Sequence, residues 1–146
     1  MTRRSLLLLA LLSLSCRAKG SGSASRVRCP HCGMLVDERS PFRAELRDDS
    51  GTRVFDTPRC ALAARLAKAP LAKMPELHVR EHYSQASLRG EEVVFVAGSD
   101  VEGPMGPELV PVHPDKVQKF MGDHRGRRTY KLGDVTQAIL KDEGAP

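Results

Sequence analysis

The segment CPHCGM at residues 29–34 constrains this chain more than any other stretch of its sequence. It places two thiols, an imidazole and a thioether within six positions, and Pro30 and Gly33 mark it as a tight turn. Two cysteines separated by two residues are typical of a redox-active dithiol, of half a zinc site, or of a site for a softer metal. The choice among these depends on the compartment of the protein and on its remaining cysteines.

The N-terminus has the pattern of a lipoprotein signal peptide. Residues 1–15 combine a short basic start with an apolar run that is too short to cross a bilayer as a stable helix. Cys16 follows the small Ser15 and is the expected site of lipidation, although Ser13 stands where a bacterial lipobox usually has Leu. The alternative is an ordinary cleaved signal that contains a cysteine. Both interpretations predict export, and the Gly/Ser composition of residues 16–27 predicts a flexible tether.

Size and charge limit the classes of function. The roughly 130 residues after Cys16 are enough for one compact domain or two very small ones. The net charge of +5 includes Arg3 and Arg4, so the mature chain carries only +3. This excess is too small and too scattered to indicate nucleic-acid binding, and we interpret the basic patch at 124–128 as a solvated hairpin turn.

The number of cysteines argues against a set of structural disulfides. Exported proteins usually pair their cysteines, which requires an even number. If Cys16 carries a lipid, three thiols remain, at Cys29, Cys32 and Cys60. Either one of them stays unpaired or all three have another purpose.

The hydrophobic pattern predicts an α+β fold. Alternation with period two predicts strands over 42–48 and 52–56, and an Ala/Leu-rich stretch with Pro58 in its first turn predicts a helix over 58–69. The elements expected beyond this helix are strands over 77–83 and 91–99, a Pro/Gly loop and short strand over 103–112, a helix over 113–124, a strand over 127–132 and a helix over 133–141.

A weak internal similarity indicates two small related ββα-type modules packed together. Aligning the two halves pairs Gly51 with Gly126 and Phe55 with Tyr130, each ahead of a predicted helix. Chance similarity between short amphipathic stretches is the alternative. The expected organisation is a signal peptide over 1–15, a tether over 16–27, a first module over 28–76, a second module over 77–141 and a disordered tail over 142–146.

A redox function for CPHC is one alternative. In strongly oxidising thioredoxin-fold proteins this sequence starts a helix, whose dipole and free amides stabilise the first thiolate. Here Gly33 and Pro41 follow the cysteines, and only the tether and a few residues precede them. The helix that such a mechanism needs is not predicted. A thiol–disulfide oxidoreductase is therefore the alternative function and not the favoured one.

A zinc-stabilised knuckle is the second alternative. Structural zinc needs four tight ligands, commonly from two paired motifs. Only Cys60 remains as a third thiol, and the chain has no second paired motif. Candidates for a fourth ligand are His31, His78, His82 and His113. We interpret His31 and His113 as solvated surface residues, and His78 and His82 as neighbours on one face of the strand predicted over 77–83.

Methionine favours copper over zinc. A thioether is neutral and soft, and together with thiolate it suits Cu(I) at low coordination number. Cys32 and Met34 lie two residues apart and therefore on the same side of an extended segment. Met34 and Met105 both lie in Gly/Pro-rich loops, whereas we expect Met74 and Met121 in the core. Met34 and Met105 are therefore the better ligand candidates.

Four stretches of the sequence share a pattern with a known family. They are CPHCGM near the mature N-terminus, FDTPRCAL after the hairpin, FVAGSDVEGPMGPELVPV and, after a predicted helix, the terminal YKLGDV. Together they resemble the NosL family of periplasmic lipoprotein copper chaperones, which are associated with the assembly of nitrous oxide reductase. The resemblance extends from about Cys29 to Leu140, over nearly the whole mature chain.

The resemblance implies a fold of two homologous small α+β modules, similar to part of the organomercurial lyase fold. It also implies one Cu(I) bound by Cys32, Met34 and Met105. The implied role is a non-enzymatic carrier, lipid-anchored at the periplasmic face of a bacterial membrane. Such a carrier delivers copper to nitrous oxide reductase, to a membrane ABC-type assembly complex, or to both. Cys29 and Cys60 are additional thiols within reach of the same site, and Cys29 and Cys32 are candidates for a disulfide when metal is absent.

Overall fold

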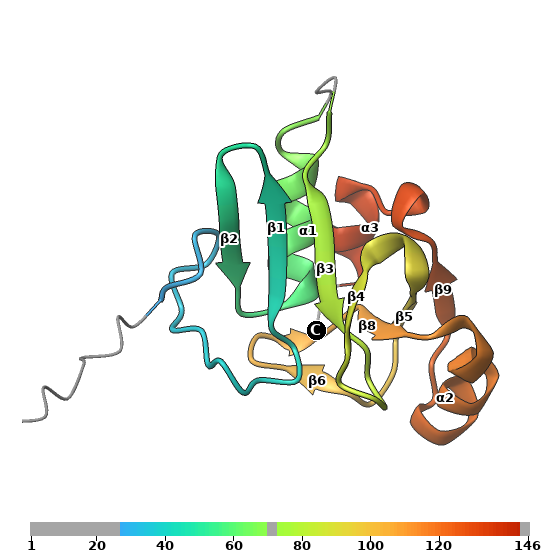
Figure 1. Cartoon of the computed structure of the whole chain (residues 1–146). Coiled ribbons are helices and arrows are strands. Elements are labelled where there is room, and N and C mark those ends of the chain that lie inside the picture. The colour runs from blue at the N-terminus through green and yellow to red at the C-terminus, as the bar shows by residue number, and fades with distance from the viewer. Residues whose placement is uncertain (1–26, 70–72, 144–146) are drawn as a thin grey trace, which may run out of the picture.

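The computed structural model describes residues 27–69 and 73–143. The predicted signal peptide, Cys16 and residues 16–26 of the predicted tether lie outside the described residues. Within the described part, no helix is both long enough and apolar enough to span a membrane. Helices and strands mix throughout this part, which confirms the predicted α+β fold class (Figure 1).

The larger sheet contains the predicted hairpin. Its strands are β1 (Ala44–Asp48), β2 (Gly51–Phe55), β3 (Glu76–Arg80) and β4 (Ser87–Arg89), antiparallel in the order β2-β1-β3-β4. Helix α1 (Pro58–Leu66) covers one face of this sheet (Figure 1). The alternation in β1 buries Ala44 and Leu46 on the helix side and leaves Glu45 and Arg47 on the open face.

The second half of the chain forms a smaller sheet and a separate hairpin. The sheet has the order β8-β5-β9, from β5 (Val94–Ala97), β8 (Val110–Val112) and β9 (Arg128–Tyr130). The hairpin consists of β6 (Glu102–Gly103) and β7 (Gly106–Pro107). The helices of this half are α2 (Val117–His124) and α3 (Gln137–Asp142), and the 3-10 turns are η1 (Gly90–Glu92), η2 (Pro114–Lys116) and η3 (Leu132–Asp134).

The prediction of a strand over 77–83 is wrong at its C-terminal end. β3 ends at Arg80, because the buried carboxylate of Glu81 accepts hydrogen bonds from the backbone N–H groups of Tyr83 (3.1 Å) and Ser84 (2.7 Å) and bends the chain into a turn. His82 therefore does not share a strand face with His78. Its ring packs against Phe120 in α2 instead, with ring centroids 4.9 Å apart.

Several other predicted elements are shorter than expected. The helix expected over 58–69 ends at Leu66, and the strand expected over 91–99 is limited to β5 after η1. The helix expected over 133–141 starts only at Gln137, because the Thr136 side chain caps it by accepting from the N–H of Ile139. The helix expected over 113–124 begins as the 3-10 turn η2 and continues as α2.

The larger of the two buried hydrophobic clusters is shared by both halves, and the smaller one lies within the second half. Strand β3 spans the boundary expected between 76 and 77 and pairs with β1 of the first hairpin, and β4 extends the same sheet by pairing with β3. Buried side chains from the larger sheet, such as Phe55, and from the second half, such as Phe95, belong to one continuous cluster. In both halves a strand leads through a capping threonine into a helix, Thr57 before α1 and Thr136 before α3. At the C-terminal end, residues 142 and 143 of the expected tail still belong to the fold.

Candidate metal centre

The CPHCGM segment folds into a tight knuckle. The backbone N–H of Cys29 donates to the carbonyl of Met34 (2.8 Å), and the N–H of Gly33 donates back to the carbonyl of Cys29 (2.8 Å). Gly33 adopts a φ of +80°, which lets the chain turn without a Cβ penalty. Arg28 closes the loop by donating from its guanidinium to the carbonyl of Gly33 (2.9 Å). No helix starts at CPHC, so the element on which an oxidising dithiol depends is missing.

The start of α1 supplies the third thiol. Thr57 has extended backbone angles and caps the helix, because its Oγ1 accepts from the N–H of Cys60 (3.1 Å). Pro58 occupies the first turn, where its missing N–H costs nothing. This start places Cys60 in the first turn of α1 and Asp56 directly before the cap. Both residues are buried.

Four side chains converge where the knuckle meets α1. The ligand atoms of Cys29, Cys32, Asp56 and Cys60 all lie within 4.8 Å of one another, and the structure gathers no other such group within its described ranges. The Cys32 Sγ donates to Asp56 Oδ2 at 3.2 Å. All three cysteines of the described part are free thiols. Cys29 and Cys60 are buried and Cys32 is half-buried, so solvent reaches the cluster from the Cys32 side.

Of the two predicted thioethers, the structure brings Met105 to the thiol cluster. Met105 lies in the turn between β6 and β7, and its Sδ is 3.9 Å from the Sγ of Cys60. Its side chain is nevertheless 55% exposed. Met34 is in the knuckle and 39% exposed, and its described contact with the site is through its backbone carbonyl. Both thioethers are therefore accessible from outside the protein.

Asp56 was not predicted from the sequence. It is 3% exposed, and its Oδ1 is buried without a hydrogen-bond partner. Burial by itself raises its pKa, but hydrogen bonds from the Cys29, Cys32 and Cys60 thiols outweigh this and lower the pKa below its usual value. In the sequence, Asp56 is marked only by its position, one residue before Thr57 and four before Cys60. That spacing is the one signal that could have indicated it as a candidate ligand.

Burial and the same carboxylate both favour the protonated forms of the Cys32 and Cys60 thiols. Burial raises the pKa of the Cys32 thiol, and the hydrogen bond to Asp56 adds to this effect. Burial also strongly raises the pKa of Cys60, with a further contribution from the hydrogen bond and charge of Asp56. A metal ion that binds here must therefore displace protons from the thiols.

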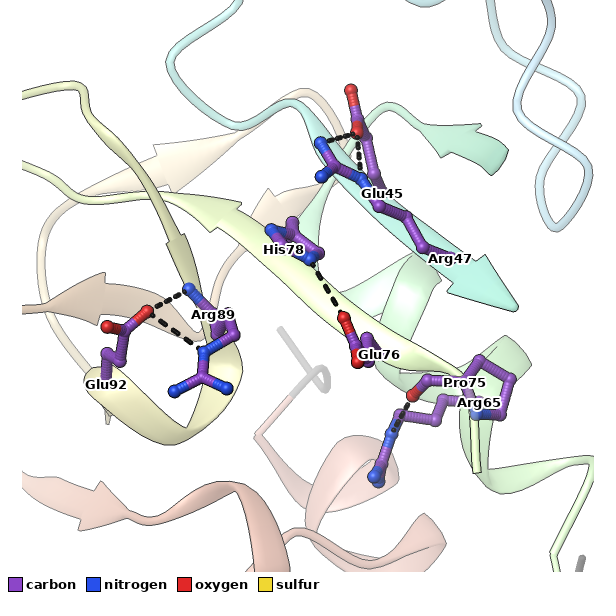
Figure 2. A network of polar contacts seen from close by, with 8 residues as sticks. All are labelled: Glu45, Arg47, Arg65, Pro75, Glu76, His78, Arg89 and Glu92. Atoms are coloured by element: carbon purple, nitrogen blue, oxygen red, sulfur yellow. Dashed lines mark hydrogen bonds and ion pairs between the residues drawn. The ribbon is translucent and has the colours of Figure 1, made fainter. Parts of the chain in front are cut away.

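The histidines considered as ligands lie away from this cluster. His31 is an exposed residue between the two knuckle cysteines, and His113 is exposed before η2. His78 lies on the open face of the larger sheet, where its Nε2 is 3.6 Å from a carboxylate oxygen of Glu76 (Figure 2). His82 packs against aromatic rings and not against the thiols. The structure thus assembles sulfur and carboxylate donors without imidazole.

A sequence model of the NosL family matches residues 23–140 of the chain. The chain belongs to the NosL family. The crystal structure of the copper chaperone NosL from Shewanella denitrificans has a similar fold, with a TM-score of 0.64 and 22% sequence identity over 76% of this chain and 90% of that one. No curated protein matches the chain. The chain thus combines the fold of a solved NosL structure with a cluster of three cysteines and one aspartate, which are residue types that bind metal ions.

Proposed function

We propose that this protein is a Cu(I)-binding metallochaperone. The observation that carries the proposal is the approach of the Met105 thioether to the Cys60 thiol, 3.9 Å apart, beside two further thiols. The candidate ligands are Cys29, Cys32, Cys60, Met105 and Met34. Thiolate and thioether together select a soft monovalent ion, whereas zinc gains little from a neutral thioether.

The exposure of the site favours a carrier over a permanent cofactor site. A carrier must release its ion by ligand exchange, which requires that the ligands of an acceptor reach the metal. Met105 and Met34 are exposed and Cys32 is half-buried, so an incoming ligand can approach from that side. We also propose a non-enzymatic function, because the CPHC pair does not lie at the helix N-terminus that activates a redox dithiol.

We propose export, lipid anchoring at Cys16 and a position at the periplasmic face of a bacterial membrane. These proposals rest on the N-terminal sequence pattern. The proposed acceptor is a periplasmic cuproenzyme, with nitrous oxide reductase or its membrane ABC-type assembly complex as the first candidates. Support for this acceptor comes from membership of the NosL family.

Zn(II) is the second candidate cargo, because of Asp56. Three thiolates and one carboxylate make a complete four-ligand set for Zn(II), and the unpartnered Oδ1 of Asp56 is free to serve as a ligand. The two metals would use different parts of the cluster. Cu(I) is expected to bind the Met105 thioether and not the Asp56 carboxylate. Zn(II) is expected to bind the Asp56 carboxylate and not the Met105 thioether.

The Met105→Leu variant is expected to bind Cu(I) about 10–100-fold more weakly and Zn(II) as tightly as the wild type. Leu has nearly the same volume and lacks only the sulfur, so the fold should remain. Competition with chromophoric Cu(I) and Zn(II) chelators under reducing, anaerobic conditions measures both affinities. Met121→Leu in α2 is the matched control, and unchanged Cu(I) affinity of Met105→Leu would remove Met105 from the site.

The Asp56→Asn variant is expected to show the opposite selectivity. Loss of the carboxylate should weaken Zn(II) binding by about 10-fold or more, because Zn(II) loses its oxygen ligand. Cu(I) binding should not weaken, because removing this negative charge makes the neighbouring thiols easier to ionise. The same competition assays apply, with Asp115→Asn on the surface as control. Equal weakening of both metals would mean that the carboxylate also holds copper.

A further inference from the structure

Glu108 is a buried carboxylate that the proposed copper site does not use. It follows β7 directly, and only 3% of its surface is exposed. Its Oε1 accepts two backbone hydrogen bonds, from the N–H of Leu109 (2.9 Å) and from the N–H of Arg59 (3.0 Å). Arg59 lies 49 residues earlier, in the first turn of α1. The side chain therefore joins the second half of the chain to the helix that carries Cys60.

This contact completes the N-terminus of α1. The first N–H groups of a helix have no partner inside the helix and must find one elsewhere. Pro58 has no N–H, the N–H of Cys60 is bonded to Thr57, and the N–H of Arg59 is bonded to Glu108. The carboxylate also lies at the positive end of the helix dipole. Glu108 thus caps α1 from a different part of the chain and holds the end from which Cys60 projects.

The same carboxylate contacts the hairpin that carries Met105. A Cβ added at Gly103 in β6 would lie 3.1 Å from Glu108 Oε2, so the backbone of β6 passes directly against this oxygen. Met105 is two residues after Gly103 and three before Glu108. The carboxylate thus contacts both β6 and the start of α1, and the side chains that the hairpin and the helix carry, Met105 and Cys60, lie 3.9 Å apart.

We propose that Glu108 is a positioning residue for the metal site, and that it holds the Met105 thioether at the distance from Cys60 at which both can bind one ion. This inference rests on the proposed Cu(I) function, because it assigns a role to the spacing of two proposed ligands. Met105 is exposed in the turn of a two-stranded hairpin, so burial in the hydrophobic core does not hold its side chain. Ordering a flexible ligand costs conformational entropy on binding, and a pre-ordered one avoids that cost.

The acceptor oxygen of Glu108 should matter more than its charge. Burial raises the pKa of this carboxyl to about 7, although the backbone N–H of Leu109 and the charge of Arg59 favour the ionised form. Both the neutral and the ionised carboxyl can accept from the N–H of Arg59. Glu108→Gln keeps an amide oxygen of the same reach and should retain the function. Glu108→Ala removes the hydrogen-bond acceptor. Glu108→Asp keeps a carboxylate, but its side chain is one methylene shorter and reaches less far towards the N–H of Arg59.

A double-mutant cycle tests the proposal. Glu108→Ala is expected to weaken Cu(I) binding about tenfold in the chain with Met105 and less than about twofold in the Met105→Leu background, because positioning acts through the thioether. Glu108→Gln should bind Cu(I) like the wild type. A purely structural role would weaken binding equally in both backgrounds and would overturn the proposal. Val112→Ala, which truncates a buried side chain in β8, is the control for general destabilisation. If Glu108→Ala does not fold, Glu108→Asp takes its place in the cycle.

A copper-free measurement separates this inference from the proposed function. In the apo protein with ¹³C-labelled methionine methyl groups, Glu108→Ala or Glu108→Asp should shift or broaden the NMR signal of Met105 and leave that of Met34 unchanged. An unchanged Met105 signal would overturn the positioning role even if the wild type binds Cu(I). A wild type that does not bind Cu(I) would overturn the proposed function, and the methyl signal would still decide whether Glu108 positions Met105.

Discussion

Replacing Cys32 by serine is expected to weaken Cu(I) binding by more than about 100-fold. Residues that only hydrogen-bond to metal ligands usually change metal affinity by about 10–100-fold, and the loss of a ligand should exceed this. The serine hydroxyl can still donate to Asp56, as the Cys32 thiol does at 3.2 Å, so the local structure should be kept. A hydroxyl is a hard donor that does not ionise near neutral pH, so the copper loses one of its thiolates. Because Cys32 is half-buried, the cost to folding should be small. Competition with a chromophoric Cu(I) chelator measures the affinity, and a urea titration checks stability.

The control for this variant lies in the same turn. His31→Gln changes the exposed residue between the two knuckle cysteines and should leave Cu(I) affinity within about threefold of the wild type, because the imidazole lies away from the thiols. If Cys32→Ser bound Cu(I) as tightly as the wild type, the proposed site as a whole would be contradicted. Cys32 is the most exposed of the three thiols and therefore the one through which an acceptor protein would reach the ion. A large loss of Cu(I) affinity in His31→Gln would mean that the His31 imidazole is a further ligand.

The sulfur side chains could be proposed as ligands from the sequence because their setting is unusual, and the structure brings Cys29, Cys32, Cys60 and Met105 close together. Met34 and Met105 lie in Gly/Pro-rich loops without the periodicity of core methionines, and Cys29 and Cys32 form a recognisable pair. Asp56 and Glu108 carry no such local signal. Each becomes notable only when distant segments meet, Asp56 among the thiols of the knuckle and Glu108 at the start of α1.

The limits of the fold prediction have the same physical cause. Alternation identifies a strand but not its partner, so the sequence places the strand expected over 77–83 in the second module, whereas β3 pairs with β1. The turn after Arg80 depends on the buried carboxylate of Glu81, which also accepts from the N–H of His113 at 3.3 Å. That contact joins residues 32 positions apart and cannot be derived from local pattern. The elements were predictable where neighbouring residues determine them, and not where distant contacts do.

The shared core leads to the second large effect, in the Phe95→Ala variant. Phe95 is fully buried in β5, yet it belongs to the same cluster as Leu46, Phe55 and Leu77 of the larger sheet. Truncation removes the contacts of a whole aromatic ring and leaves a cavity, which should lower the free energy of unfolding by about 3–5 kcal/mol. Since small domains are stable by only about 5–15 kcal/mol, this is a large fraction of the total.

The same experiment tests whether the two expected modules fold separately. Urea unfolding of the wild type and of Phe95→Ala, followed by circular dichroism and by the reactivity of the Cys60 thiol, should give one coincident transition, shifted to lower urea in the variant. Cys60 lies in the first half and Phe95 in the second, so coincidence means that the second half cannot unfold while the first stays intact. Had the modules been independent, Phe95→Ala would leave Cys60 protected after half of the circular dichroism signal was lost. The proposed metal site would take Cys60 from the first half and Met105 from the second, so cooperative unfolding of the two halves would keep these two side chains together.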